Sequence, residues 1–346
     1  YRPLERREEI HARLTLHVNG RSLWLDAALS IAVAPRQSIG VEPRAAVLPR
    51  TRLKDGVTIE YTIRNFLPHK TAGRVGVRAP VGWSADNAAF TITAEDSVAR
   101  GRLVVRPPAG IPSGDYVLHV RTDQASEPVT VRVIDAALAP DVMLGIIRSY
   151  DTMLESAAAT LGVNYALLSD ADLASADLNA FTTIVVDIRA YLVREALRKQ
   201  NDRLLEYVRR GGNLVVMYQR EQEWKPEYAP YPFQITRRRV CVEEAPVTIL
   251  APGHPLVTAP NRIGPSDWLG WKQERALYFP GNVSDSYARI LATGDPDEPP
   301  LTTGYLVAPC GRGSYIYTSF VWYRQMKEGS PGAFRNFANM ISYPAF

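Results

Sequence analysis

The chain has 346 residues, of which 46% are apolar and 22% charged, and its formal net charge is +4. This length suits about two domains, and this composition can bury a core without metals or disulfide staples. The basic residues are scattered, so no nucleic-acid-binding stripe is expected, and no apolar run is long enough to predict a membrane span.

Residues 1–37 are expected to contain a β-hairpin. Leu14, Leu16 and Val18 alternate with polar residues, Asn19-Gly20 follows, and a second alternating run comes next. Two such runs around Asn-Gly are a strong hairpin signal. We interpret this segment as the tail of an upstream region, and we expect the chain to be a piece of a longer protein.

Residues 38–136 are predicted to form an all-β domain. Apolar residues alternate with polar ones over 57–63, 116–120 and 129–133, as in strands with one buried face. Turn residues such as Pro80, Gly82 and Pro112 separate these runs. About seven short strands at regular spacing predict an immunoglobulin-like (Ig-like) β-sandwich.

Residues 141–346 are predicted to form an α/β domain after a linker at 136–140. Apolar runs at 142–147, 183–186 and 214–217 are typical of parallel strands buried on both faces. Helices are predicted over 153–161, ended by Gly162, and over 194–209. This alternation predicts a flavodoxin-like, doubly wound α/β fold. Further strands are predicted at 165–168, 247–250, 289–292, 305–308 and 315–320, a helix at 333–341, and long loops within 220–285.

Polar side chains follow the predicted parallel strands, where open α/β sheets bind their ligands. The candidates for ligand binding at this edge are Asp151, Asp187, Arg189 and Tyr218. The alternative interpretation is that these side chains cap helices and pair with one another. The sequence leaves both interpretations open.

No nucleophile stands where such a fold would carry one. The run at 214–217 ends in Tyr218-Gln219, without a Ser or Cys between glycines. Cys241 and Cys310 are expected to be structural, and their spacing does not show whether they pair. No histidine spacing predicts a metal site, so no catalytic residue, metal or cofactor is expected in this chain.

Two aromatic segments also qualify as ligand sites. Tryptophans beside carboxylate, amide and guanidinium groups are typical of sugar-binding clefts. They are equally typical of buried loops and of protein interfaces. The candidate residues are Asp267, Trp268, Trp271, Gln273, Glu274, Arg275, Trp322 and Arg324.

The sequence from about 145 to 344 resembles the C-terminal region of large bacterial PIG-L (LmbE-type) de-N-acetylases. The resemblance lies in phrases such as DIRAY, NDRLLEYVRRGGNLVVMY, DWLGWKQERALYF and RQMKEGSPGAFRNFANM. It implies a class I glutamine amidotransferase-like domain without its catalytic cysteine. Residues 40–135, with PAGIPSGDY and APVGWSADNAAFTI, resemble the NPCBM-associated, NEW-type Ig-like domain that precedes it. The turn at 148–151 departs from the family, which has a Gly-rich or acidic turn there.

The resemblance also implies a functional context. The catalytic domain of this family lies upstream and carries a His-Pro-Asp-Asp zinc motif, which this sequence lacks. Zinc is therefore expected only in that upstream domain, and deacetylase activity does not carry over to this chain. The resemblance implies only that the whole protein acts on N-acetylated sugars. It also leads us to expect an extracytoplasmic (periplasmic or secreted) location.

Three functions are compatible with these features. The first is a non-catalytic accessory region that binds a glycan or a partner protein, or that supports the upstream catalytic domain. The second is a hydrolase that uses Asp187, Glu274 and Arg275 for acid–base work. The third is assembly of a homo-oligomer, by analogy with other domains that lack catalytic residues.

Overall fold

The structure is a computed structural model that describes residues 7–32, 35–95 and 97–345. The chain divides into two compact units. The first comprises Tyr1–Ala45, Gly56–Pro108 and Tyr116–Val131, and the second Ala46–Asp55, Ala109–Asp115 and Arg132–Phe346.

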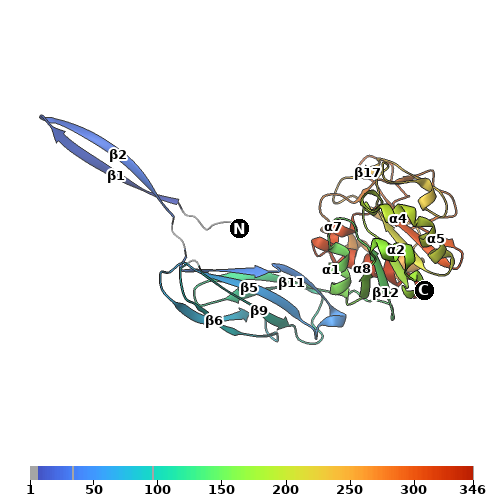
Figure 1. Cartoon of the computed structure of the whole chain (residues 1–346), viewed down its shortest axis with the longest axis horizontal. Helices are drawn as coiled ribbons and strands as arrows, with labels where there is room; N and C mark the ends of the chain where they lie inside the picture. Colours follow the sequence, from blue (N-terminus) through green and yellow to red (C-terminus); the bar gives the residue numbers. More distant parts are fainter. Residues whose placement is uncertain (1–6, 33–34, 96, 346) are drawn as a thin grey trace. The chain divides into compact units, whose positions relative to one another are not determined.

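A long antiparallel hairpin opens the described chain, as the sequence predicts (Figure 1). Strands β1 (Arg7–Val18) and β2 (Arg21–Ala32) pair along their whole length and form a separate two-stranded sheet. Asn19 and Gly20 both have positive φ, 50° and 72°, which a type I′ turn requires at its two central positions.

Two antiparallel sheets make up most of the first unit. Alternate residues of their strands are buried, among them Ile59, Ile63 and Val120, so each sheet has one apolar face. One sheet has the order β3 (Gln37–Glu42), β5 (Val57–Asn65), β9 (Val98–Arg106), β7 (Ser84–Ala85). The other has the order β4 (Ala45–Pro49), β11 (Ser126–Ile134), β10 (Gly114–Arg121), β6 (Thr71–Arg78), β8 (Ala88–Ile92).

A mixed seven-stranded sheet forms the centre of the second unit in the described chain. Its order is β13 (Asn164–Leu167), β12 (Met143–Ile147), β14 (Thr183–Val186), β15 (Asn213–Met217), β24 (Gly313–Thr318), β23 (Tyr305–Cys310), β21 (Ala288–Arg289). The first five strands are parallel, and the last two run antiparallel to their neighbours.

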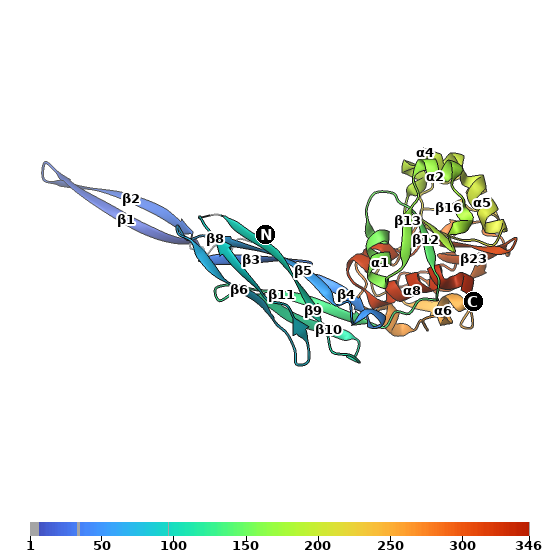
Figure 2. The same cartoon turned by 60° about the horizontal axis from the view of Figure 1, so that its bottom comes forward.

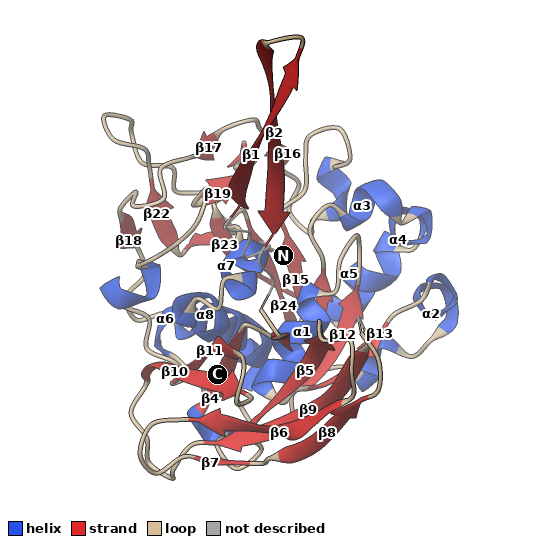
Figure 3. Ribbon diagram, turned by 90° about the vertical axis from the view of Figure 1, so that its left-hand side faces the viewer, coloured by secondary structure: helices blue, strands red, loops and turns tan. Residues whose placement is uncertain are grey.

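Three small antiparallel sheets lie in the chain after β15 (Figure 3). Each consists of two strands of two or three residues. They are β16 (Gln234–Ile235) with β20 (Pro280–Gly281), β17 (Arg239–Val240) with β19 (Ala276–Leu277), and β18 (Val247–Ile249) with β22 (Leu291–Thr293).

Helices cover both faces of the seven-stranded sheet. Helices α1 and α8 pack on one face, and α2, α4 and α5 on the other (Figure 2). The described helices are α1 (Met153–Leu161), α2 (Asp170–Ser175), α3 (Ala190–Val193), α4 (Glu195–Lys199), α5 (Asn201–Arg209), α6 (Pro255–Thr258), α7 (Trp322–Lys327) and α8 (Pro331–Ser342). Short 3₁₀ turns are η1 (Arg50–Arg52), η2 (Leu178–Ala180), η3 (Pro226–Tyr228), η4 (Pro265–Trp268) and η5 (Tyr343–Ala345).

The predicted fold class, an Ig-like sandwich followed by a flavodoxin-like or amidotransferase-like doubly wound domain, is wrong as a description of this chain. Strands account for 38% of the chain and helices for 21%, and several small curled sheets make it more like a β-sandwich or jelly roll. The physical reason lies after Tyr218, where strand and helix no longer alternate. Strands of two or three residues carry no readable period, so the sequence could not reveal them.

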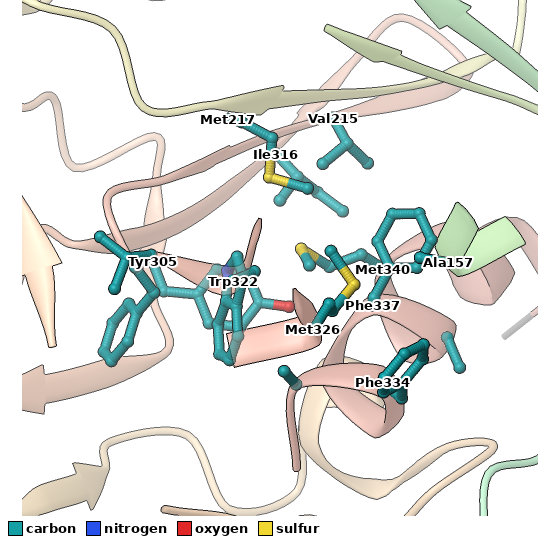
Figure 4. Packing of buried hydrophobic residues seen from close by; sticks show 14 of the residues in the cluster. Ala157, Val215, Met217, Tyr305, Ile316, Trp322, Met326, Phe334, Phe337 and Met340 are labelled. Carbon is teal, nitrogen blue, oxygen red and sulfur yellow. The ribbon is translucent and has the colours of Figure 1, made fainter. Parts of the chain in front are cut away.

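Two layers of apolar side chains enclose the seven-stranded sheet. On one face Val215, Met217 and Ile316 pack against Phe337 and Met340 of α8 (Figure 4). On the other face the intervening strand residues, such as Val216 and Tyr317, pack against α5. Successive residues of each strand therefore enter opposite cores, as strand geometry requires.

A glycine allows α8 to approach the chain segment of η4 very closely. A Cβ atom added to Gly332 would overlap the backbone of Asp267, which cannot move aside as a flexible side chain could. We expect Gly332→Ala to lower the free energy of unfolding by about 1–3 kcal/mol, the usual cost of overpacking. Gly253→Ala is the matched control, since nothing lies within 4 Å of its added Cβ, and its expected change is within about 0.5 kcal/mol. Urea unfolding of both variants tests this, and equal midpoints would contradict it.

Candidate functional site

Asp187 directly follows β14 and ties together the ends of two neighbouring strands. Its side chain accepts hydrogen bonds from the backbone N–H of Ser149 (3.0 Å), the Ser149 hydroxyl (2.6 Å) and the N–H of Ile188 (2.8 Å). Burial raises the pKa of Asp187 to about 6, against the effect of these donors, and the charge of Asp151 adds to the rise. Both carboxylate oxygens are engaged by the protein itself.

Gln219 occupies the turn after β15, where the sequence lacks a nucleophile. Its buried side-chain amide donates to the carbonyls of Asp187 and Met217, both at 2.9 Å. Its side-chain oxygen accepts from the N–H of Tyr191 at 3.3 Å. The turn is therefore held by an amide that has no nucleophilic chemistry of its own.

Arg189 pairs with a buried carboxylate from a later turn. Its guanidinium lies 3.2 Å from Glu223, and the Glu223 side chain also accepts from the N–H of Arg220 at 2.9 Å. The same guanidinium lies 5.8 Å from the ring centre of Tyr150, which is exposed. Arg189 and Tyr150 thus form a cation–π contact at the surface.

Tyr218 lies among two further tyrosines. Its ring centre is 5.9 Å from that of Tyr278 and 6.0 Å from that of Tyr323. Burial raises the pKa of Tyr218 well above its ordinary value, so its hydroxyl keeps its proton at neutral pH. Arg220 lies 5.2 Å from the ring centre of Tyr278 and completes a cluster of rings and cations.

Glu274 and Arg324 form an ion pair beside this cluster. The Arg324 guanidinium lies 3.0 Å from Glu274 and donates to the Tyr323 hydroxyl at 2.6 Å. Arg239 lies 4.0 Å from the other oxygen of Glu274. Glu274 therefore faces two cations, one at each carboxylate oxygen.

The three candidate tryptophans lie in the hydrophobic core. Trp271 is 2% exposed and Trp322 is 0% exposed, and the rings of Trp268, Trp271, Trp322 and Phe320 contact one another. The indole N–H of Trp322 donates to the hydroxyl of Thr318 at 2.8 Å. Trp271 and Trp322 therefore present no free face on which a sugar could stack.

The other two candidate aspartates, Asp151 and Asp267, cap turns of the chain. Asp151 accepts from the N–H of Met153 at 2.9 Å, at the start of α1. Asp267 accepts from the N–H of Gly264 at 2.8 Å and pairs with Arg335 at 2.8 Å. These contacts match the capping and pairing interpretation of the sequence.

Gln273 and Arg275 sit on either side of Glu274 and have different surroundings. Gln273 is exposed, and its backbone N–H donates to Glu243. Arg275 is buried and donates from Nε to the carbonyl of Ala245 (3.0 Å) and from Nη1 to that of Trp268 (2.7 Å). Asp187, Glu274 and Arg275 share no contact within the described ranges. The structure therefore does not bring together the acid–base pair that the hydrolase hypothesis requires.

We call the side chains of Asp187, Arg189, Tyr218, Gln219 and Glu274 the strand-end cluster. Three residues that the sequence did not mark complete it. Glu223 holds Arg189, while Tyr278 and Tyr323 pack around Tyr218. Each comes from a segment distant in sequence from its partner. No local pattern could have marked them, because their roles follow from how the loops return to the sheet.

The thiols, possible metal ligands and helix lengths of the described chain bear on the remaining expectations. Cys241 is exposed, Cys310 is buried, and both are free thiols. In the part of the chain that the structure describes, no group of three or more His, Cys, Asp or Glu side chains could hold a metal ion. No described helix is long and apolar enough to cross a membrane.

Comparisons with known proteins give only distant likenesses. No protein-family model and no curated protein matches the sequence. A cytoplasmic protein from Salmonella typhimurium LT2 is 11% identical with a TM-score of 0.39, over 58% of this chain and 99% of its own. An exo-β-1,4-mannosidase from Opitutaceae bacterium strain TAV5 is 12% identical with a TM-score of 0.36, over 60% of this chain and 36% of its own.

A cold-adapted β-galactosidase from Rahnella sp. R3 is 15% identical with a TM-score of 0.35, over 55% of this chain and 32% of its own. The chain thus spans about a third of the length of these two glycosidases. Both enzymes act on carbohydrates, but likenesses at these scores carry no argument about the function of this chain.

The raised pKa of Asp187 predicts a pH-dependent stability difference. Its folded-state pKa lies above that of an unfolded aspartate, so its contribution is complete below about pH 4 and is lost as the pH rises through about 6. Asp187→Asn keeps an oxygen acceptor but cannot titrate. From pH 4 to pH 7 we expect this variant to gain roughly 2–3 kcal/mol of stability relative to the natural chain. Chemical unfolding at both pH values measures this, and a pH-independent difference would rule it out.

Proposed function

We propose that this chain is a non-catalytic accessory region of a PIG-L-type de-N-acetylase that acts on N-acetylated sugars. Its task in this proposal is to bind a protein partner, and the catalytic domain of the same enzyme is the partner expected. The observation that carries the proposal is the exposed apolar face of the β1–β2 hairpin. The resemblance of the C-terminal 200 residues to that family supplies the enzyme context, with export as part of the same proposal.

The hairpin has one mainly apolar face and one mainly polar face. Leu14 lies opposite Leu25, and Leu16 opposite Leu23, so these four side chains share a face. They are all exposed, with Leu16 at 48% and Leu23 at 58%. A cluster of leucines on one face of a ribbon marks an interaction surface more often than isolated apolar residues do.

The opposite face is mainly polar, although it also carries Trp24, which is 68% exposed. Arg13 and Asp26 lie across from each other and form an ion pair at 2.6 Å. The next pair but one, His17 and Ser22, is hydrogen-bonded at 2.9 Å. This contrast between the faces indicates that the leucine face, rather than the whole ribbon, binds the partner.

The hairpin also needs a partner on energetic grounds. A two-stranded ribbon without further packing is at best marginally stable in water. Burying the four leucines would add about 1.5–3 kcal/mol for each side chain. A docked partner would therefore both order the hairpin and gain affinity from it.

The strand-end cluster supports a non-catalytic role. Asp187, Arg189 and Glu274 each have partners within the protein. A catalytic acid or base must instead reach a proton of the substrate in a plausible pose. The tryptophans proposed as sugar platforms are buried, so partner binding is favoured over glycan binding.

Charge substitutions on the two faces test the proposal. In Leu16→Glu/Leu23→Lys an ion pair across the strands keeps the hairpin but removes the apolar face. The matched control is Arg13→Glu/Asp26→Arg, which reverses the ion pair on the opposite face and leaves every apolar side chain of the hairpin in place. We expect the first variant to bind an isolated PIG-L-type deacetylase domain at least tenfold more weakly than the natural chain. The control should bind within about threefold.

Calorimetric titration measures these affinities, and thermal unfolding checks that both variants are folded. Equal affinities for both variants, or no binding by the natural chain, would contradict the proposal. Dimerisation of the natural chain that only Leu16→Glu/Leu23→Lys abolishes would replace it with the oligomer-assembly function.

A further inference from the structure

The buried guanidinium of Arg275 lacks an anionic partner. The side chain is 4% exposed, and its Nε and Nη1 atoms donate to two backbone carbonyls. The third nitrogen, Nη2, has no hydrogen-bond or ion-pair partner among the described residues. Arg275 also lines a groove at the surface of this unit.

Two other interior arginines at the loops of the second unit are instead paired with carboxylates. Arg189 pairs with Glu223, and Arg335 pairs with Asp267. Arg275 has only the face of Trp271 nearby, with the ring centre 5.0 Å from Cζ. Burial lowers the pKa of Arg275 to about 10, and the more distant charges of Glu244 and Glu243 oppose the shift. A buried cation with spare donors is costly unless an anion completes its shell.

The groove that Arg275 lines is an apolar cavity of about 440 Å³. A cavity of this size matches those that hold small molecules. Its apolar wall consists of Pro246, Val247, Ile249, Pro265, Trp268 and Leu269. The one other charged residue in the lining is Glu244, which is exposed.

We propose that this cavity binds a small monocarboxylate with an apolar body. The ligand carboxylate accepts a hydrogen bond from Nη2 of Arg275, and its apolar body packs on Val247, Ile249 and Leu269. A charge-assisted bond to a buried guanidinium is stronger than a neutral one. A single negative charge is favoured over a phosphate dianion, because one cation is available and the carboxylate of Glu244 would repel further negative charge.

Binding of three simple probes to the full chain tests the chemistry of the site. Octanoate carries both the anion and the apolar body, octan-1-ol only the body, and acetate only the anion. We expect octanoate to bind at least tenfold more tightly than either of the others, as measured by isothermal titration calorimetry. Equal affinities for octanoate and octan-1-ol, or no octanoate binding at millimolar concentration, would overturn the proposal.

Two substitutions locate the binding. Arg275→Gln removes the charge and should abolish the preference for octanoate over octan-1-ol. Because Arg275 also holds two loops, Leu269→Asp serves as a second variant; Leu269 is 72% exposed, so a charge there leaves the core intact. It should weaken octanoate binding at least tenfold by repulsion at the cavity wall. The matched control, Leu192→Asp on α3, is outside the cavity and should bind as the natural chain does.

The outcomes separate this site from the hairpin. Octanoate binding that Leu269→Asp leaves unchanged would place the ligand elsewhere and overturn the assignment. The hairpin variant Leu16→Glu/Leu23→Lys should retain full octanoate affinity, whatever its affinity for a deacetylase domain. Failure of one proposal therefore leaves the other measurable.

Discussion

The central sheet of the second unit is buried on both faces, and this constraint determines where its polar side chains can lie. Strand residues such as Val185 and Val216 enter one core or the other, and neither core can accept an unpaired charge. Polar groups therefore gather where the strands end. There they satisfy each other: Asp187 holds Ser149, Gln219 holds the neighbouring turn, and Glu223 holds Arg189. The cluster that looks functional in the sequence stabilises the strand ends.

Two features of the chain depart from this pattern, because their apolar or charged groups are not fully covered or paired. The β1–β2 hairpin forms a sheet of its own, and its leucine face is exposed. The Arg275 cavity has an interior cation whose donors the protein does not all use. An uncovered apolar face suits a macromolecular partner, whereas an apolar groove lined by one buried cation suits a small anionic ligand. These two features motivate the two proposals.

The sequence predicted the elements with a clear period or a special turn. The hairpin at Asn19-Gly20 and helix 153–161 with its left-handed Gly162 are confirmed. The sequence-based prediction failed where a ligand cleft and a buried core use the same residue types. Trp271 and Trp322 beside charged residues suit a sugar cleft as well as a core, and only the folded chain places them inside. The fold class was missed because the short strands after Tyr218 pair across long loops, which leaves no periodic signal.

The central claim is that the chain acts through the leucine face of its hairpin rather than through its strand-end cluster. Amide hydrogen exchange of the full chain, with and without a PIG-L-type deacetylase domain, tests this claim most directly. The account predicts new protection across residues 11–28, with the segments around Asp187 and Gln219 unchanged. Protection that appears at those strand ends while residues 11–28 still exchange freely would contradict it.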